Sequence, residues 1–133
     1  MSLNVFIVDD DKMIILLHKV IVARSKLCEN PLTFSNGNAV LEFMKTEFNY
    51  NQHYLILLDI NMPVMNGWEF LDAIQPLPFA NNVSIIMVTS SVDTGDKIRA
   101  KKYPQIISFM EKPLKADNCN YIKSLPEVVS YFS

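Results

Sequence analysis

Five polar residues stand at or just after the ends of apolar runs, and their side chains are of the types that bind a cation or a phosphoryl group. They are Asp9 and Asp10 after "LNVFIV", Asp59 after "YLILL", Thr89 at the end of "VSIIMVT" and Lys112 after "IISFME". Three carboxylates in one pocket repel one another unless a cation joins them. Oxygen ligands without His or Cys favour Mg²⁺, Ca²⁺ or Mn²⁺ over zinc. The ligands are too few for a calcium cage, so Mg²⁺ that also binds a phosphoryl group fits best, with Mn²⁺ as the alternative.

Lys112 and Thr89 fit the same chemistry. A lysine ammonium is a point charge for phosphate oxygens, and a threonine hydroxyl can donate a hydrogen bond to one of them. These roles require that segments far apart in the chain meet, so the sequence must encode a fold that brings them together.

Short apolar runs alternate with helical patterns along the chain. The runs are rich in β-branched and aromatic residues without polar alternation, which predicts strands buried on both faces. The expected strands are 3–8, 31–34, 54–59, 83–89 and 106–110. The expected helices are 11–27, 38–48, 66–74, 93–103 and 115–125, the last followed by a short turn over 126–132.

Local signals support two of these helices and weaken a third. Asp11 is a plausible N-cap of the first helix, and Asn66 with Glu69 three residues later is a variant of the capping box. Gly95, in the first turn of the helix over 93–103, weakens that helix.

The alternation predicts an α/β fold, a flavodoxin-like, doubly wound, five-stranded parallel sheet of order 2-1-3-4-5 with five helices. In such sheets ligands bind beyond the carboxyl ends of the strands, near the point where the strand order reverses. The five polar residues are therefore expected to meet there. We expect one domain over 1–133, because no repeat, linker or low-complexity stretch interrupts the pattern.

Composition excludes several classes of protein. The chain has 133 residues, half of them apolar, and a net charge of −2, so it is not disordered. Nothing in that charge suggests direct nucleic-acid binding or attraction to an anionic membrane. Cys28 and Cys119 fit no metal or redox spacing and are interpreted as reduced thiols of a cytoplasmic protein. The opening apolar run is too short to span a membrane.

The chain resembles the receiver domain of two-component response regulators along essentially its whole length. The motifs that carry the resemblance, in order, are "VDDD" (8–11), "LLDINMPVMNGWEFL" (57–71), "VTSS" (88–91) and "EKP" (111–113). Each motif alone is weak, but together and in this order they are specific. The resemblance implies a phosphoacceptor protein that switches a surface for an unknown downstream target.

What the resemblance implies for the site can be stated by residue. Asp59 would accept a phosphoryl group from a phosphohistidine, on a sensor histidine kinase or a histidine phosphotransfer protein. Asp9, Asp10 and Asp59 would hold Mg²⁺, together with the backbone carbonyl of Asn61. The protein would assist its own phosphorylation and dephosphorylation without being an enzyme in the usual sense.

The resemblance also implies a switch. Thr89 and Lys112 would contact the phosphoryl group, and Phe109, three residues before the lysine, would be the switch aromatic. The peptide bond before Pro113 would be cis, which would turn Lys112 into the pocket. The output surface would be formed by the helix over 93–103, the strand over 106–110 and the helix over 115–125.

Three alternatives stay open. Haloacid-dehalogenase enzymes also use an aspartate nucleophile and Mg²⁺, but need an acid two residues later, where this chain has Asn61. A scaffold protein could bind partners regardless of phosphorylation, although the complete site argues against it. The domain could also be cut from a longer regulator, although the ending "VVSYFS" favours a stand-alone protein.

Other residues carry weaker expectations. His18 and His53 have no partner pattern and are expected at the surface. Met62 and Met65 are expected to pack within their loop. The first helix is apolar on more than one face, so either Ile15 or Leu16 is expected to remain outside and to dock a helical phosphodonor beside Asp59.

Overall fold

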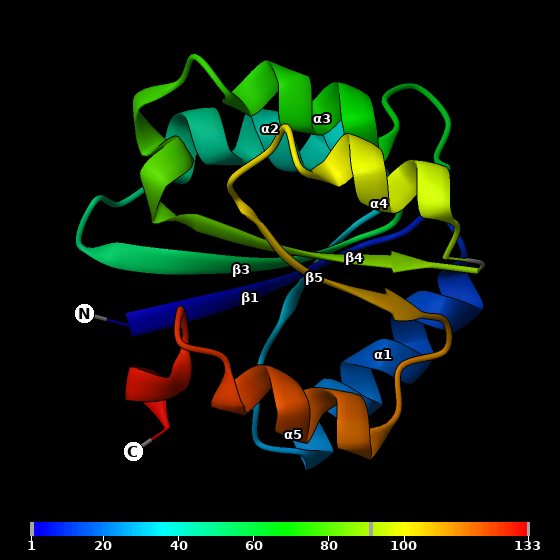
Figure 1. The fold of residues 1–133 in the computed structure, drawn as a ribbon. Coiled ribbons are helices and arrows are strands. Elements are labelled where there is room, and N and C mark those ends of the chain that lie inside the picture. Colours follow the sequence, from blue (N-terminus) through cyan, green and yellow to red (C-terminus); the bar gives the residue numbers. More distant parts are fainter. Residues whose placement is uncertain (1, 91, 133) are drawn as a thin grey trace.

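Strands and helices alternate strictly in the computed structural model, which describes residues 2–90 and 92–132 (Figure 1). The strands are β1 (Ser2–Val8), β2 (Leu32–Phe34), β3 (Gln52–Leu58), β4 (Val83–Thr89) and β5 (Ile106–Glu111). The helices are α1 (Lys12–Arg24), α2 (Gly37–Glu47), α3 (Gly67–Ile74), α4 (Thr94–Ala100) and α5 (Ala116–Ser124). Short 3₁₀ turns follow at Pro78–Asn82 and Val129–Tyr131.

All strand pairs are parallel, and the strand order is β2-β1-β3-β4-β5. This confirms the predicted flavodoxin-like topology. In the register, Val8 pairs with Leu58 and Leu58 with Met87, while Thr89 pairs with Glu111. The residues that follow these strand ends therefore emerge at one edge of the sheet.

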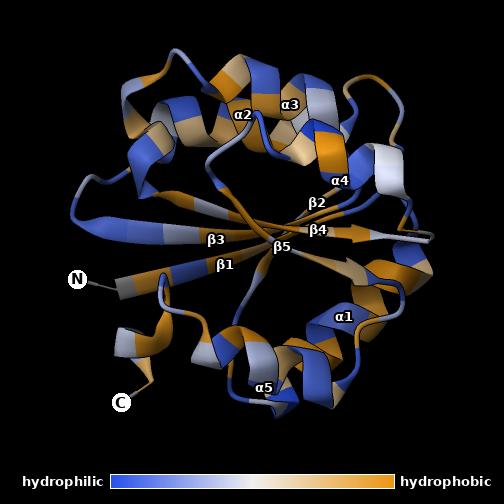
Figure 2. Cartoon of the chain, in the orientation of Figure 1, coloured by the Kyte–Doolittle hydropathy of each residue, from blue (hydrophilic) through white to orange (hydrophobic). Residues whose placement is uncertain are grey.

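Two apolar layers enclose the sheet. Figure 1 shows α2, α3 and α4 on one face and α1 with α5 on the other, and Figure 2 shows apolar residues concentrated along the strands. One buried cluster joins Phe6, Ile56 and Ile85 to the first group of helices, and the other joins Ile7, Leu57 and Ile86 to the second. Alternate residues of each strand thus enter opposite clusters, which explains why the strands are apolar on both faces.

The helix caps follow the sequence signals closely. The Asp11 side chain accepts hydrogen bonds from the N–H groups of Met13 and Ile14, and the capping box of Asn66 and Glu69 is complete. Both caps lie beside the carboxyl edge of the sheet, where they fix the chain as it leaves β1 and the loop after β3.

The end of α1 differs from the expectation. The helix stops at Arg24, whereas the apolar pattern suggested that it continues to residue 27. Lys26 has a φ of 63°, the N–H of Leu27 donates to the carbonyl of Val22, and that of Lys26 donates to Ala23. This is the Schellman arrangement that ends many helices, here with lysine in the position usually held by glycine.

The start of β1 and the last 3₁₀ turn, Val129–Tyr131, lie on the same side of the molecule. Figure 1 shows both at the edge where the strands begin, opposite the edge where they end.

Within residues 2–90 and 92–132, no helix combines the length and the apolar character needed to cross a bilayer.

Gly67 packs the start of α3 against the end of β3. Its N–H donates to the carbonyl of Ile60 at 2.8 Å. A Cβ atom at this position would lie 2.6 Å from the carbonyl oxygen of Asp59 and 3.1 Å from the Cα of Ile60. Because both contacts are with backbone, neither can move without displacing the chain around Asp59.

We therefore expect Gly67→Ala to lower the free energy of unfolding by about 1–3 kcal/mol, the usual penalty of overpacking. Gly95→Ala is the matched control, because its new Cβ would meet only a side-chain oxygen of Asp93 at 3.3 Å. Urea unfolding of both variants measures the difference. Equal stability of Gly67→Ala and the unmodified protein would contradict the packing argument.

Candidate functional site

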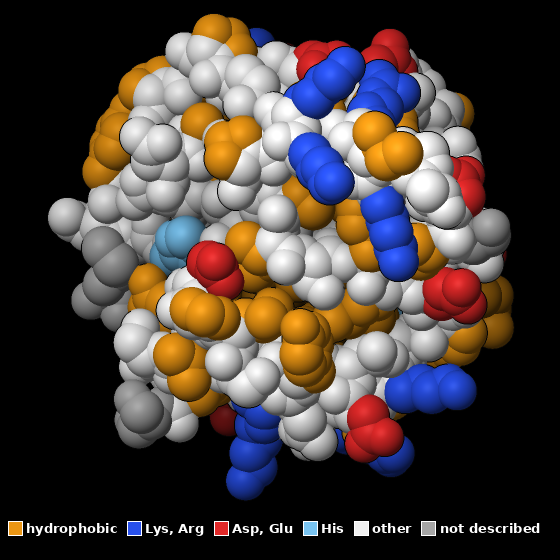
Figure 3. Space-filling view, viewed as in Figure 1, with side chains coloured by type: hydrophobic (Ala, Val, Ile, Leu, Met, Phe, Trp, Pro, Cys, Tyr) orange, Lys and Arg blue, Asp and Glu red, His pale blue; other side chains and the backbone are white. Residues whose placement is uncertain are grey.

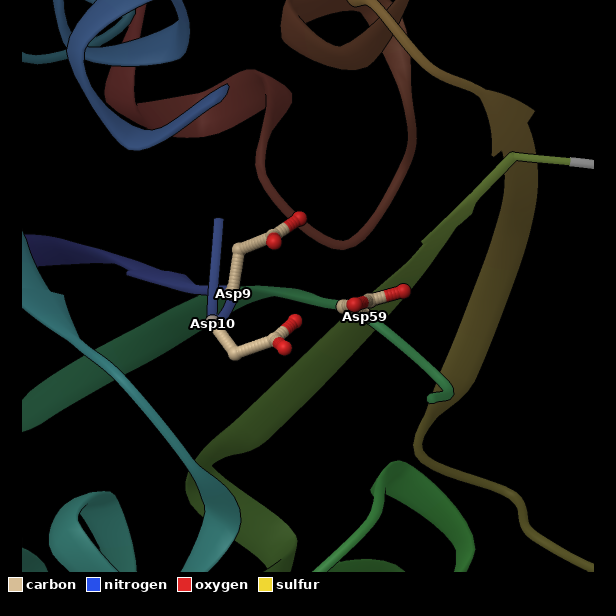
Figure 4. Close-up of side chains that lie close together, drawn as sticks. All are labelled: Asp9, Asp10 and Asp59. Carbon is tan, nitrogen blue, oxygen red and sulfur yellow. The ribbon is translucent and has the colours of Figure 1, made fainter. Parts of the chain in front are cut away.

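Three carboxylates gather at the carboxyl edge of the sheet. Asp9 and Asp10 follow β1, and Asp59 follows the neighbouring strand β3. One ligand oxygen from each lies within 4.8 Å of the others, and Figure 4 shows the three side chains around one space. Asp9 and Asp59 are buried, at 2% and 4% exposed, whereas Asp10 faces solvent. The structure thus brings together the three acids that the sequence singled out and leaves one side of them open.

Backbone hydrogen bonds fix these strand ends. The N–H of Asp59 donates to the carbonyl of Val8, and that of Asp9 donates to Phe34, each at 3.0 Å. The Asp9 carboxylate also accepts from the N–H of Asp11 at 2.9 Å. The buried carboxylates therefore extend from chain that is tied to the next strand, and their separation is set by the sheet.

Lys112 supplies the positive charge of the site. Its Nζ lies 2.7 Å from Oδ2 of Asp9 and 3.2 Å from Oδ2 of Asp59, and its side chain is only 14% exposed. Burial acts to lower the pKa of Lys112, but the hydrogen bond with Asp9 and the charges of Asp59 and Asp9 outweigh it and raise that pKa. Lys112 is therefore a firmly protonated ammonium.

The chain around Lys112 is held on the side of β4. The Lys112 N–H donates to the carbonyl of Thr89 at 2.7 Å, and the peptide bond between Lys112 and Pro113 is cis. Thr89 itself is buried at the end of β4, next to β3 in the sheet. Thr89 and Lys112 thus stand at the ends of the adjacent strands β4 and β5, joined by this backbone hydrogen bond.

The environment of Asp59 strongly disfavours its charged form. Burial and then the charge of Asp9 raise its pKa from 3.8 to about 6. Lys112 and the N–H of Asn61 act in the opposite direction without cancelling this effect. One ammonium is thus insufficient for the two buried carboxylates that it contacts.

The donor set suits a hard divalent cation. The cluster offers carboxylate oxygens only, with neither His nor Cys among its members. Mg²⁺ prefers such oxygens and commonly keeps several of its waters, which the exposed side at Asp10 permits. A cation there would also offset the charge of Asp9, which together with burial raises the pKa of Asp59. Asn61 is exposed in the loop after β3.

Phe109 lies beside an open space. It is half-buried, packs against the cluster that α2 and α3 cover, and lines a cavity of about 230 Å³ between α4 and β5. Lys97 and Lys101 of the α4 segment line the same cavity. Ser91, the last residue of the "VTSS" motif, lies outside the described residues.

The expectation that both histidines lie at the surface is wrong for His18. His18 is buried at 1% exposed, and its Nε2 accepts a hydrogen bond from the N–H of Leu114. His53 is half-buried, with its Nε2 2.7 Å from the Ser84 hydroxyl. For His18 a signal existed: it stands four residues before the buried Val22, on the inner face of α1. Met62 belongs to the core cluster under α2 and α3, and Met65 packs against it, so both methionines of the loop serve packing.

One face of α1 is apolar and exposed. Met13, Leu16, Leu17 and Val20, at helical spacing, are 71%, 58%, 43% and 42% exposed. Ile15, the other candidate, does not belong to this face, because it packs against the core beneath α1. The face starts close to Asp10, since α1 begins two residues after it.

Comparisons with known proteins agree with this geometry. Residues 5–121 match the family model described as "Response regulator receiver domain". The chain is 30% identical over 115 residues to Regulatory protein VanRB of Enterococcus faecalis (strain ATCC 700802 / V583), a match that covers 86% of this chain and 48% of the relative. The chain thus spans about half the length of that relative.

Solved structures show the same architecture. A two-component response regulator from Cytophaga hutchinsonii matches with a TM-score of 0.84 and 26% identity, over 96% of this chain and 97% of that one. A response regulator receiver protein from Dyadobacter fermentans DSM 18053 matches with a TM-score of 0.79 and 26% identity, over 91% and 95% of the two chains. Fold, site and sequence therefore agree that this chain belongs to the receiver-domain family of two-component response regulators.

Proposed function

We propose that this protein accepts a phosphoryl group on Asp59 from a phosphohistidine donor, in a reaction that depends on Mg²⁺. The observation that supports this most directly is the contact of Lys112 with both Asp9 and Asp59, in a corner that holds three carboxylates. Receiver domains are signalling phosphoacceptors, not enzymes in the usual sense, and in this proposal Asp59 is the nucleophile, the carboxylates are cation ligands and Lys112 is the ammonium that such an acceptor needs.

The chemistry requires little beyond positioning and charge neutralisation. A carboxylate oxygen of Asp59 forms a bond to phosphorus while the bond from phosphorus to the donor imidazole nitrogen breaks. The electron pair of that bond stays with the nitrogen. Lys112 keeps its 2.7 Å contact with Asp9 and turns its remaining donors from Asp59 to the phosphoryl oxygens.

Asp9, Asp10 and Asp59, with the backbone carbonyl of Asn61, are the residues that would hold Mg²⁺. The ion would supply positive charge that screens the repulsion between the Asp59 carboxylate and the incoming phosphoryl group. The protein's own contribution is to hold the three carboxylates on two neighbouring strand ends and to present Asp59 to the donor.

The first test is phosphorylation by a small donor. We expect acetyl phosphate with Mg²⁺ to phosphorylate the protein once, and Asp59→Asn to remove the product because the amide is a poor nucleophile. Asp117→Asn, at an exposed position of α5, is the control for the loss of one acid and should react like the unmodified protein. Intact-mass measurement gives the yield, and full phosphorylation of Asp59→Asn would refute the assignment.

Magnesium binding should depend on pH with a defined sign. The raised pKa of Asp59, at about 6 without the ion, means that protons compete with the cation below that pH. Mg²⁺ affinity should therefore be weaker at about pH 5 than at about pH 8, because metal ligands must be deprotonated. Asp10→Asn should weaken binding at both values, since a charged ligand is lost. Calorimetric titration tests this, and an affinity that rises on acidification would contradict it.

The phosphorylated site would switch the surface formed by α4, β5 and α5. Thr89 can donate a hydrogen bond to the new phosphoryl oxygens, a contact to a charged group that contributes about 1.5–3 kcal/mol. Allosteric couplings are typically about 1–3 kcal/mol, so one such bond is sufficient for a strong bias. Movement of Thr89 toward the phosphoryl group would leave space into which Phe109 could turn, and α4 would shift in response.

The surface that would switch combines charged and apolar parts. Figure 3 shows lysine and arginine side chains gathered over α4, above an apolar strip along β5.

The phosphodonor would dock on the exposed face of α1. Its four apolar side chains lie on one helical stripe that begins near Asp10, which suits a helix that presents its phosphohistidine to Asp59. A helix face that remains apolar in solvent is typical of an interaction site.

Leu16→Glu should slow transfer from a phosphorylated histidine kinase by about tenfold, equivalent to about 1.4 kcal/mol, because a charge enters the apolar contact. The rate with acetyl phosphate should not change, since this small donor needs no docking surface. Val129→Glu, another exposed apolar position, is the control. The kinase is chosen by a transfer screen with the unmodified protein, and equal slowing with both donors would exclude docking through α1.

A further inference from the structure

His18 ties the first helix to the loop that carries Lys112. Its ring is 1% exposed, and its Nε2 lies 3.0 Å from the backbone nitrogen of Leu114. The hydrogen bond is buried and joins residues 96 positions apart. Leu114 comes two residues after Lys112, just beyond the cis peptide bond.

The bond requires one particular form of the imidazole. Since the N–H of Leu114 donates, Nε2 must accept, so the ring is neutral and its proton is on Nδ1. Burial lowers the pKa of His18, which supports the neutral form, although the charge of Asp9 acts against it. An apolar side chain at position 18 would leave the buried N–H of Leu114 without this acceptor.

Lys112 consequently stands between two backbone anchors. On one side its own N–H donates to Thr89 at 2.7 Å, and on the other the N–H of Leu114 donates to His18. From this fixed segment the side chain reaches the carboxylates of Asp9 and Asp59. We propose that His18 is a positioning residue, which acts through Leu114 to hold the Lys112 ammonium at the phosphoryl site; this role rests on the function proposed above.

A buried histidine that only fills the core would behave differently. In that case its replacement would lower the stability of the fold and leave the Lys112 step unchanged. The two cases separate with a matched pair of variants. Gln and Met are similar in length and flexibility, but only Gln can offer an acceptor oxygen to Leu114.

We expect His18→Met to slow phosphorylation by acetyl phosphate by roughly tenfold. A displacement of about 1 Å in a positioning group can slow a reaction by about 100-fold. The expected effect is smaller because the second anchor of Lys112, its hydrogen bond to Thr89, remains. His18→Gln should restore most of the rate. In a Lys112→Ala background, His18→Met should cause no further slowing, because residues that act through one another are not additive. Slowing that persists without Lys112, or a Gln variant no faster than Met, would overturn the proposal.

A second measurement is made on the unmodified protein, so it requires no phosphorylation and does not depend on whether a variant folds. Nitrogen-15 NMR of the imidazole in the unmodified protein should show a neutral ring with its proton on Nδ1, and a coupling from Nε2 to the amide of Leu114. A proton on Nε2 at neutral pH would overturn the assignment. Absence of phosphorylation in the unmodified protein would instead count against the proposed function, so the two failures are distinguishable.

Discussion

One ammonium shared between two buried carboxylates is the interaction on which the carboxyl edge of this molecule depends. The Lys112 ammonium offsets part of the repulsion between Asp9 and Asp59 at the ends of β1 and β3, while burial and the charge of Asp9 still raise the pKa of Asp59. The rest of the fold keeps this arrangement from relaxing, because the strand ends are tied to their neighbours and both faces of the sheet are covered. The site is therefore preorganised to gain from a cation and from a group that brings acceptor oxygens for the ammonium.

Most of the fold could be predicted because its signals are local. Strands apolar on both faces, joined by helices, leave few arrangements other than a parallel sheet between two helical layers. The caps at Asp11 and Asn66 could likewise be predicted, because each depends on residues close to it in the sequence. The end of α1 was missed because a lysine occupies the left-handed position at Lys26, where a glycine would have marked the stop.

The site was predictable for a different reason: its residues follow strand ends, and the topology fixes which strand ends meet. His18 shows where this logic ends. Its partner is a backbone N–H 96 residues away. Every residue except proline has the same backbone N–H, so the sequence does not show which one will be the partner. The helical period could have shown that His18 points inward beside Val22, but not what it would contact. Exposure also separated Leu16 from Ile15, two neighbours that the sequence could not rank.

The parallel sheet separates the site from both ends of the chain. Every strand starts at the edge where the chain begins and ends, and every site residue lies at the opposite edge. A strand of seven residues such as β4 spans roughly 23 Å, so a domain fused to either end would be attached a whole strand length from Asp59. A change at Asp59 would therefore reach that point of attachment through the strands and helices that lie in between.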